Sequence, residues 1–522
     1  MFCDKLTEKA IVLSDNPLAK TKNGNIAGIK KSSTYIFRGI KYANAERFHM
    51  PSKVGPWENS KPAVSYGYVC PERTTPIGYD AQVCPHYYMP QDENCQYLNI
   101  WTQSLDRNEK KPVMVWMHGG GWNSGSSVEQ YAYDGEELSK FGNVVVVSFN
   151  HRHNVLGSLN LSEYGEEYAK SSYCAMGDII ECLKWIKENI SCFGGNPENV
   201  MLFGQSGGVA KILYTMQCPE CDGLYHKVAI GGGIKEQIIP EGYTKKQIAQ
   251  KLARLTVEKL GLSKQTIKKI EEFPYWDLVE AANQAEEKLK EELGRDFSWR
   301  WEPIEDGELI IGSTLKNGFR KETSKIPMII GNVFGEANSN LIPNNKLGDG
   351  YKNHWSDLQI QTFCKEKWGN EYETILEEFK KVYPDNNPAD VLFMDYKERD
   401  GQLNLVKKRL EIGGDVWNWL FKKESDLNGG TVAWHCSEIP FVFHNVSFIE
   451  ASFEPGISDQ LEDIMCQAWV NMAYSGNPNG GCVPGWNKMQ KDNIYTMIFD
   501  EKCKVEKNHD IKLRELLKKA DK

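Results

Sequence analysis

A serine stands between glycines in a short segment that could supply a nucleophile. Gly204-Gln-Ser206-Gly-Gly208 directly follows the apolar run at 200–203 and directly precedes the helical text at 209–216. A G-x-S-x-G turn between strand and helix strains the backbone at the serine, and flanking glycines leave room for it. The turn also lifts the hydroxyl to the positive end of the following helix. An ordinary Gly/Ser turn is the alternative, but the flanking elements favour a nucleophile at Ser206.

A second glycine-rich segment could stabilise the anion that a serine attack creates. His118-Gly-Gly120-Gly121-Trp122 follows the apolar run at 113–117. Successive glycines let backbone N–H groups approach a carbonyl oxygen without interference from a Cβ atom. An H-G-G-G loop after an early strand is an oxyanion-hole element of lipases and esterases. A phosphate-binding glycine loop is the alternative, but no Lys-Ser/Thr follows and no helical pattern begins there.

Both segments lie at the ends of runs that predict buried parallel strands. Val113–Met117, Val144–Phe149 and Val200–Phe203 are short apolar runs followed by turn residues. Such runs are typical of strands covered on both faces. Between the last two, Asp178–Ile190 carries an apolar stripe with helical spacing. The order strand, helix, strand predicts an α/β fold.

The rest of the chain suggests one large core with a helical excursion. The 522 residues would divide into about three or four average domains, but no repeat or low-complexity linker is visible. Residues 244–294 are charged and helical in pattern, so we expect a single domain over 1–522 with a helical insertion at about 240–300. Sheet-like text returns at Met328–Ile330 and Thr431–Trp434. The Lys-rich last twenty residues predict a solvated helix or a frayed tail.

Composition excludes several classes of partner. The net charge of −9 leaves no basic field for nucleic acid or anionic lipid. The longest apolar stretches are strand-length, whereas a membrane span needs about 20 apolar residues. The N-terminus lacks the pattern of a secretory signal, which predicts a cytoplasmic protein with reduced thiols. Cys218-Pro-Glu-Cys221 has zinc-knuckle spacing but no second pair, so we expect a surface turn and neither metal nor cofactor.

Four segments resemble a known family in the order in which that family has them. They are Tyr35–Ala43 (YIFRGIKYA, similar to FxGIPYA), Asp92–Trp101 (DENCQYLNIW, similar to SEDCLYLNVW), Phe193–Pro197 (FGGNP) and Gly476–Asn479 (GNPN). With the two glycine segments, they make the chain similar to the type-B carboxylesterases of the cholinesterase/carboxylesterase family. The resemblance implies the α/β-hydrolase fold, with a central, mostly parallel sheet flanked by helices and with helical insertions.

The resemblance also assigns an acid and a base. The segment MIIGNVFGE, which ends at Glu336, is similar to the family's GvNxdEG, with Ala337 in place of the last glycine. The segment HCSEIPFVF, which begins at His435, is similar to HxxElxfvF. The sequence around Glu336 alone favours a solvated loop carboxylate, and it is the resemblance that reverses this in favour of a catalytic acid. Asp306 and Glu438 are the next candidates for the acid.

Three other histidines lie near the expected sheet. His151 and His153 belong to a segment that resembles a structural part of the family, and His118 is expected to orient its own loop. We therefore expect none of the three to act as the base.

The family's chemistry implies a role for each residue. Ser206 would form an acyl-enzyme, with His435 as general base and Glu336 as orienting acid. Gly120, Gly121 and Gly207 would donate N–H groups to the oxyanion, although the family commonly has alanine at the position of Gly207. A second departure is the triplet Gly231-Gly-Gly233, where the family usually has Ser-Gly, so a supporting hydroxyl is expected to be missing.

The leading hypothesis is a serine carboxylester hydrolase acting on a small-molecule ester. An amidase, a carbamate hydrolase or a lactonase would use the same triad, and a non-catalytic binding protein of this fold would typically lack the nucleophile. Trp122 and Trp434 adjoin catalytic segments and are expected to line the pocket. The loop at 71–94 contains Tyr79, Tyr87 and Tyr88 but no tryptophan, which argues against choline esters.

One disulfide stays open at this stage. Cys70 and Cys95 match the ends of a loop that a disulfide closes in the family, whereas the expected cytoplasmic location favours free thiols.

Overall fold

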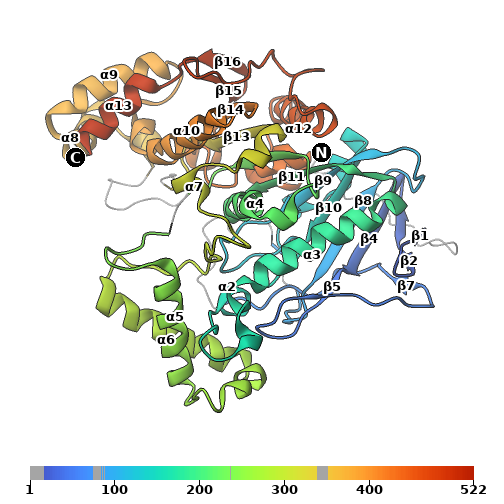
Figure 1. The fold of residues 1–522 in the computed structure, drawn as a ribbon. Coiled ribbons are helices and arrows are strands. Elements are labelled where there is room, and N and C mark those ends of the chain that lie inside the picture. Colours follow the sequence, from blue (N-terminus) through green and yellow to red (C-terminus); the bar gives the residue numbers. More distant parts are fainter. Residues whose placement is uncertain are drawn as a thin grey trace.

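A computed structural model describes residues 17–73, 84, 86–87, 89–234, 237–337 and 351–521. In these residues the strands form an eleven-stranded sheet and two small ones. The large sheet has the order β16-β15-β14-β13-β12-β11-β9-β10-β8-β4-β3, and it is parallel from β10 to β15 (Figure 1). Its strands are β3 (Ile29–Lys31), β4 (Thr34–Lys41), β8 (Tyr97–Thr102), β9 (Lys111–Met117), β10 (Val145–Phe149), β11 (Gly195–Gln205), β12 (Lys227–Gly231), β13 (Met328–Val333), β14 (Val416–Phe421), β15 (Tyr495–Phe499) and β16 (Lys504–Lys507).

Both faces of the sheet are buried because its strands alternate between two apolar cores. In β9, Val113 and Val115 belong to one core cluster, whereas Met114 and Trp116 belong to the other. The first cluster includes side chains of α3 (Cys174–Asn189) and α4 (Gly207–Gln217), and the second includes those of α12 (Ser458–Ser475). The alternation of side chains along a strand explains why the runs predicted as buried strands are apolar throughout.

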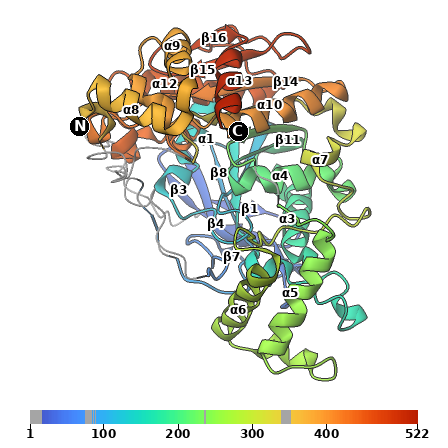
Figure 2. The same cartoon turned by 90° about the vertical axis from the view of Figure 1, so that its left-hand side faces the viewer.

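The remaining elements surround this sheet at its edges and ends. The helices are α1 (Glu136–Gly142), α2 (Asn154–Ser158), α5 (Lys245–Lys259), α6 (Tyr275–Leu293), α7 (Thr314–Asn317), α8 (Asp357–Trp368), α9 (Tyr372–Val382), α10 (Tyr396–Glu411), α11 (Ile439–Phe443) and α13 (Ile511–Ala520). Short strands are β1 (Leu18–Lys20), β2 (Asn25–Ala27), β5 (Ala43–Asn44), β6 (Ser52–Lys53) and β7 (Lys61–Pro62). Figure 2 shows α5 and α6 together at one end of the molecule and α8, α9 and α13 at the other. No described helix is both long and apolar enough to cross a membrane.

The helices α5 and α6 lie within the stretch predicted to be helical. A complete capping box at Thr244 and Gln247 begins α5 by satisfying free backbone N–H groups. The apolar faces of both helices are buried, and their Leu252 and Leu278 belong to the core cluster that covers one face of the sheet.

Two predictions of local structure are wrong. The segment Thr431–Trp434 is not a strand of the sheet, because it makes only isolated bridges to Ser425 and Gly335; the strand of this region is β14. The C-terminal segment is helical, but α13 is not solvated on all sides. Leu513 and Leu517 are at most 1% exposed, so this helix packs one apolar face on the core.

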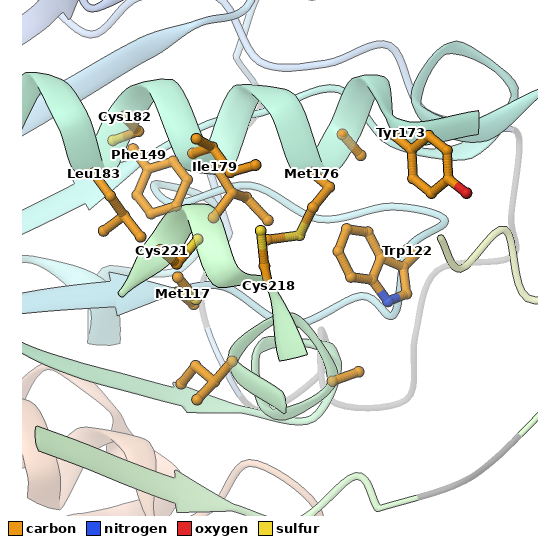
Figure 3. Packing of buried hydrophobic residues seen from close by; sticks show 14 of the residues in the cluster. Met117, Trp122, Phe149, Tyr173, Met176, Ile179, Cys182, Leu183, Cys218 and Cys221 are labelled. Atoms are coloured by element: carbon orange, nitrogen blue, oxygen red, sulfur yellow. The ribbon is translucent and has the colours of Figure 1, made fainter. Parts of the chain in front are cut away.

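The turn at Cys218–Cys221 is also different from the prediction. Only Pro219 and Glu220 are exposed, whereas both cysteine side chains are fully buried. Figure 3 shows Cys218 beside Met176 of α3 within the core. The two cysteines therefore contribute to packing, as small apolar side chains do.

A buried ion pair fixes the segment after β10 to α3. The Arg152 guanidinium donates to both oxygens of Asp178, at 2.9 and 2.8 Å, and the side chains are 2% and 0% exposed. A third guanidinium nitrogen donates to the carbonyls of Glu46 and His49. This segment, which also contains His151 and His153, is therefore structural.

We predict that Arg152→Met lowers the free energy of unfolding by about 3–5 kcal/mol, because it leaves Asp178 buried without its partner. Lys53→Met is the control, since it removes an ion pair to Glu188 whose side chains are 64% and 37% exposed; its effect should be below about 1 kcal/mol. Urea unfolding followed by tryptophan fluorescence measures both. Equal, small effects would contradict a structural role for the buried pair.

Candidate active site

Ser206 forms the turn that joins β11 to α4. Its backbone has φ 55° and ψ −120°, a strained conformation for a residue with a side chain. The turn also lies against the end of β9: a Cβ atom on Gly204 would lie 2.9 Å from the carbonyl oxygen of Met117, and one on Gly208 would lie 2.0 Å from it. Glycine is thus required on both sides of Ser206 for the turn to approach β9.

The loop at 118–121 rests directly on this turn. Gly120 and Gly121 have φ values of +79° and +62°, which favour glycine. A Cβ atom on Gly207 would lie 2.2 Å from the backbone nitrogen of Gly121. The structure therefore brings the predicted oxyanion donors together beside Ser206. It also explains why glycine replaces the family's alanine, because the loop occupies the space that a methyl group at 207 would need.

The acid and the base come from two loops that pair with each other. Gly335 forms a β-bridge with Trp434, and its N–H donates to the carbonyl of Ala433 at 2.9 Å. This pairing puts Glu336 next to His435, and the Nδ1 atom of His435 contacts Oε2 of Glu336. The other carboxylate oxygen accepts from the N–H of Val333 at 2.9 Å. The Glu336 carboxylate is therefore held from both sides and directed at the imidazole.

The Glu336 carboxylate stabilises the charged form that His435 takes when it accepts a proton. Burial disfavours the imidazolium, but the adjacent Cys436 sulfur and the Glu336 carboxylate outweigh burial and raise the pKa of His435 well above its usual value. A base whose conjugate acid is stabilised in place can accept and hold a proton from a nucleophile.

Glu438 is poorly suited to the role of the acid. Burial, followed by the charge of Glu336, raises the pKa of Glu438 to about 8. At neutral pH its carboxyl group is therefore mostly uncharged and cannot stabilise an imidazolium. Asp306 accepts N–H groups of Glu308 and Ile310 within its own turn. In the described part of the chain, Glu336 is the one of these three candidates whose carboxylate contacts the ring of His435.

Gln205 is a site residue that the sequence analysis missed. Its Nε2 atom lies 3.3 Å from Nδ1 of His435, and its Oε1 accepts from the thiol of Cys436 at 3.0 Å. It occupies the variable position before the nucleophile in G-x-S-x-G. The polar residue at this position could have indicated a site residue, since the position points toward the loop that carries His435.

The triplet at 231–233 has no room for the family's hydroxyl. A Cβ atom on Gly232 would lie 2.8 Å from a carboxylate oxygen of Glu336, and one on Gly233 would lie 2.4 Å from Cα of Ser206. Both residues have positive φ values, +64° and +70°. The glycines that stand in place of the family's hydroxyl thus let this backbone pack directly against Ser206 and Glu336.

The three histidines near the sheet are buried. His118, His151 and His153 are each 1% exposed. Burial first, and the charge of Lys211 second, lower the pKa values of His118 and His151 well below the usual range. The Nδ1 atom of His118 lies 3.1 Å from the carbonyl of Gly119, within its own loop.

Trp122 and Trp434 do not present a free face to a substrate. They are 1% and 4% exposed, and Figure 3 shows Trp122 inside the core beside Met176. The expectation that they line the pocket is not supported, because neither ring reaches the cavity described next. Of the loop tyrosines, Tyr79 and Tyr88 lie outside the described residues, and Tyr87 packs on Tyr131 with ring centroids 4.2 Å apart.

A cavity of about 510 Å³ begins beside the nucleophile turn. Gly233, whose backbone packs on Ser206, is one of its lining residues. Apolar side chains include Ala210, Leu213 and Ile234, and Tyr214 adds a hydroxyl. Its volume lies within the range typical of small-molecule sites.

The chain matches a known family over nearly its whole length. Residues 15–514 match the Carboxylesterase family. The para-nitrobenzyl esterase of Bacillus subtilis (strain 168) is 27% identical, over 96% of this chain and 98% of its own length. Carboxylesterase 4A of Bos taurus is 26% identical, over 92% and 91%.

Solved structures lead to the same family. An esterase from anaerobic Clostridium hathewayi, described as able to hydrolyse aliphatic aromatic polyesters, is 39% identical with a TM-score of 0.90. The match covers 98% of this chain and 100% of that one. A thermophilic para-nitrobenzyl esterase has a TM-score of 0.74 at 25% identity, over 96% and 100%. The chain therefore belongs to the carboxylesterase family, and it is a serine carboxylic ester hydrolase with the α/β-hydrolase fold.

Proposed function

We propose that Ser206, His435 and Glu336 form the catalytic triad of this hydrolase. The observation that carries the proposal is the contact between Glu336 and His435, made by paired loops at the carboxyl ends of β13 and β14. Ser206 lies on a strained turn at the carboxyl end of β11, at the same edge of the parallel sheet. In open α/β sheets, substrates bind at this edge.

The reaction would pass through an acyl-enzyme. The Ser206 hydroxyl oxygen bonds to the ester carbonyl carbon while its proton moves to His435. The carbonyl oxygen becomes an oxyanion that accepts N–H groups of Gly120, Gly121 and Gly207. Collapse breaks the bond to the alcohol oxygen, which takes the proton from His435 and leaves Ser206 acylated. Water then attacks the acyl carbon and gives a proton to His435. The bond to Ser206 breaks, the Ser206 oxygen takes that proton, and the carboxylic acid is released.

Replacement of the acid tests the triad. Glu336→Gln should lower kcat by about 10³- to 10⁴-fold, because an amide cannot stabilise the imidazolium. Glu438→Gln is the matched control: it exchanges a buried, mostly uncharged carboxyl group for an amide and should change kcat by less than about 10-fold. Steady-state hydrolysis of p-nitrophenyl butyrate measures both. Near-normal turnover in Glu336→Gln, or the larger loss in Glu438→Gln, would refute the assignment.

The cavity beside Ser206 suggests the class of substrate. We propose that it accepts neutral esters with short, medium or aromatic acyl groups in preference to choline esters and long-chain triglycerides. Its volume of about 510 Å³ is limited, and Ala210, Leu213 and Ile234 offer apolar contacts to an acyl group. The lining also contains Lys245, which pairs with Glu302 and Glu305. The relative that hydrolyses aliphatic aromatic polyesters supports esters with an aromatic group, and the para-nitrobenzyl esterase supports an aromatic ring on the alcohol side of the ester.

A substrate panel tests this specificity and the choice of bond. We expect kcat/KM for p-nitrophenyl esters to be highest at short or medium chain length and to fall before C16, with butyrylthiocholine and emulsified triglyceride far lower. Matched amides and carbamates distinguish an esterase from an amidase or a carbamate hydrolase. Leu213→Trp should reduce the rate with longer chains more than that with acetate, because it fills the cavity. A kcat/KM that rises to C16, or equal turnover of the choline ester, would contradict the pocket assignment.

The organisation as one domain over 1–522, with an insertion at about 240–300, and the cytoplasmic location both stay predictions. In the structure Cys70 and Cys95 are free and buried. Their state in cells would follow the redox conditions of the compartment. Fractionation of the source cells therefore tests the predicted location and, with it, the expected state of these two thiols.

A further inference from the structure

A buried lysine lies directly behind the glycine loop. Lys211, in the helix that follows the nucleophile turn, is 1% exposed. Its Nζ atom donates to the carbonyl of His118 at 2.7 Å and to the carbonyl of Gly119 at 3.0 Å. The lysine therefore connects α4, which begins at the nucleophile, to the loop that would hold the oxyanion.

The surroundings of Lys211 offer no ion pair to account for its burial. Among the described residues, no carboxylate lies within ion-pair distance of its Nζ atom. Its other near neighbour is the Trp122 ring, whose centroid is 6.0 Å away. Burial lowers the pKa of Lys211 to about 7, and the charge of Glu129 only partly opposes this. Burying an amine without an opposite charge costs folding free energy. Ion pairing therefore does not account for Lys211, and another function is needed to explain its position.

Its two hydrogen bonds act on the peptide units of the oxyanion loop. The carbonyl of Gly119 and the N–H of Gly120 belong to one peptide unit, and Gly120 is an expected oxyanion donor. A hydrogen bond to the carbonyl side of a peptide polarises its N–H side and strengthens donation there. The same bond holds the peptide plane, so that the N–H cannot rotate away from the site.

We propose that Lys211 is a positioning residue of the oxyanion hole, which orients the loop at 118–121 and polarises the N–H of Gly120 toward the transition state. The proposal rests on the proposed function of Ser206 and the loop. Orientation needs only N–H donors, which both the amine and the ammonium supply, whereas polarisation is stronger from the ammonium.

Lys211→Met separates this role from general stability. It removes both hydrogen bonds and leaves a side chain of similar length. We expect kcat for p-nitrophenyl butyrate to fall about 10- to 100-fold. Removal of a direct oxyanion donor typically lowers kcat by about 10²- to 10³-fold, so an indirect effect should be smaller. A trifluoromethyl ketone forms a tetrahedral adduct bearing an oxyanion, so its inhibition constant should rise by a similar factor, while KM stays within about two-fold.

Lys111→Met is the matched control. Lys111 is also a buried lysine, at the opposite end of β9 from the loop, and it pairs with Glu109 at 2.9 Å. Its loss should affect thermal stability but leave kcat and the inhibition constant within about two-fold. If Lys211→Met does not fold, Lys211→Leu, which also lacks an N–H donor, decides the question by the same parallel loss.

The outcomes separate this proposal from the triad. Unchanged kcat and inhibition in a folded Lys211 variant would overturn it, as would a rise in KM without a weaker ketone complex. If Ser206→Ala binds the ketone as tightly as the wild type does, the proposed function fails instead, because the ketone then forms no adduct with Ser206.

Discussion

The active site depends on the close approach of three backbone segments to one another: the turn at 204–208, which carries Ser206, the loop at 118–121 and the triplet at 231–233. Turn, loop and triplet lie so near one another that Cβ atoms on Gly207, Gly208 or Gly233 would overlap the backbone of a neighbouring segment. Side chains larger than hydrogen would push these segments apart. In the proposed site this approach would put N–H groups, rather than side chains, around the reacting carbonyl, and such backbone donors are oriented before substrate binds.

The second requirement is a charged group beside the base, and the sheet supplies it through topology. The parallel order of β11, β12, β13 and β14 brings loops from distant parts of the chain to one edge. Two carboxyl groups lie in this region, yet their environments differ. Glu336 accepts a backbone N–H and contacts His435, whereas an oxygen of Glu438 is buried without a partner and its pKa is raised. Environment, more than residue type, thus determines which carboxylate can serve the base.

Local patterns were sufficient to predict the central strands, a helix at 178–190 that the structure has as α3, helices within 244–294, and the two glycine segments, because these depend on periodicity and turn chemistry. Glu336 and His435 needed the family resemblance, since nothing in their immediate sequence separates a catalytic acid from a solvated one. The predictions failed for segments whose position is determined by contacts with distant parts of the chain. Trp122 lies next to the loop in sequence but turns into the core, and Thr431–Trp434 has strand-like residues but lies beyond the end of β14. The contacts of Gln205 and Lys211 could not be predicted, because they form only when folding brings loops against these residues.

In the proposed mechanism, the turn at 204–208, the loop at 118–121 and His435 together activate one serine. Intact-mass analysis after reaction with a fluorophosphonate probe tests it most directly, with digestion to locate the adduct. We predict one rapid adduct, on Ser206, which is absent in Ser206→Ala and retained in Ser124→Ala, a change of a neighbouring loop serine. Rapid labelling that persists in Ser206→Ala, or that maps to another residue in the wild type, would contradict the account.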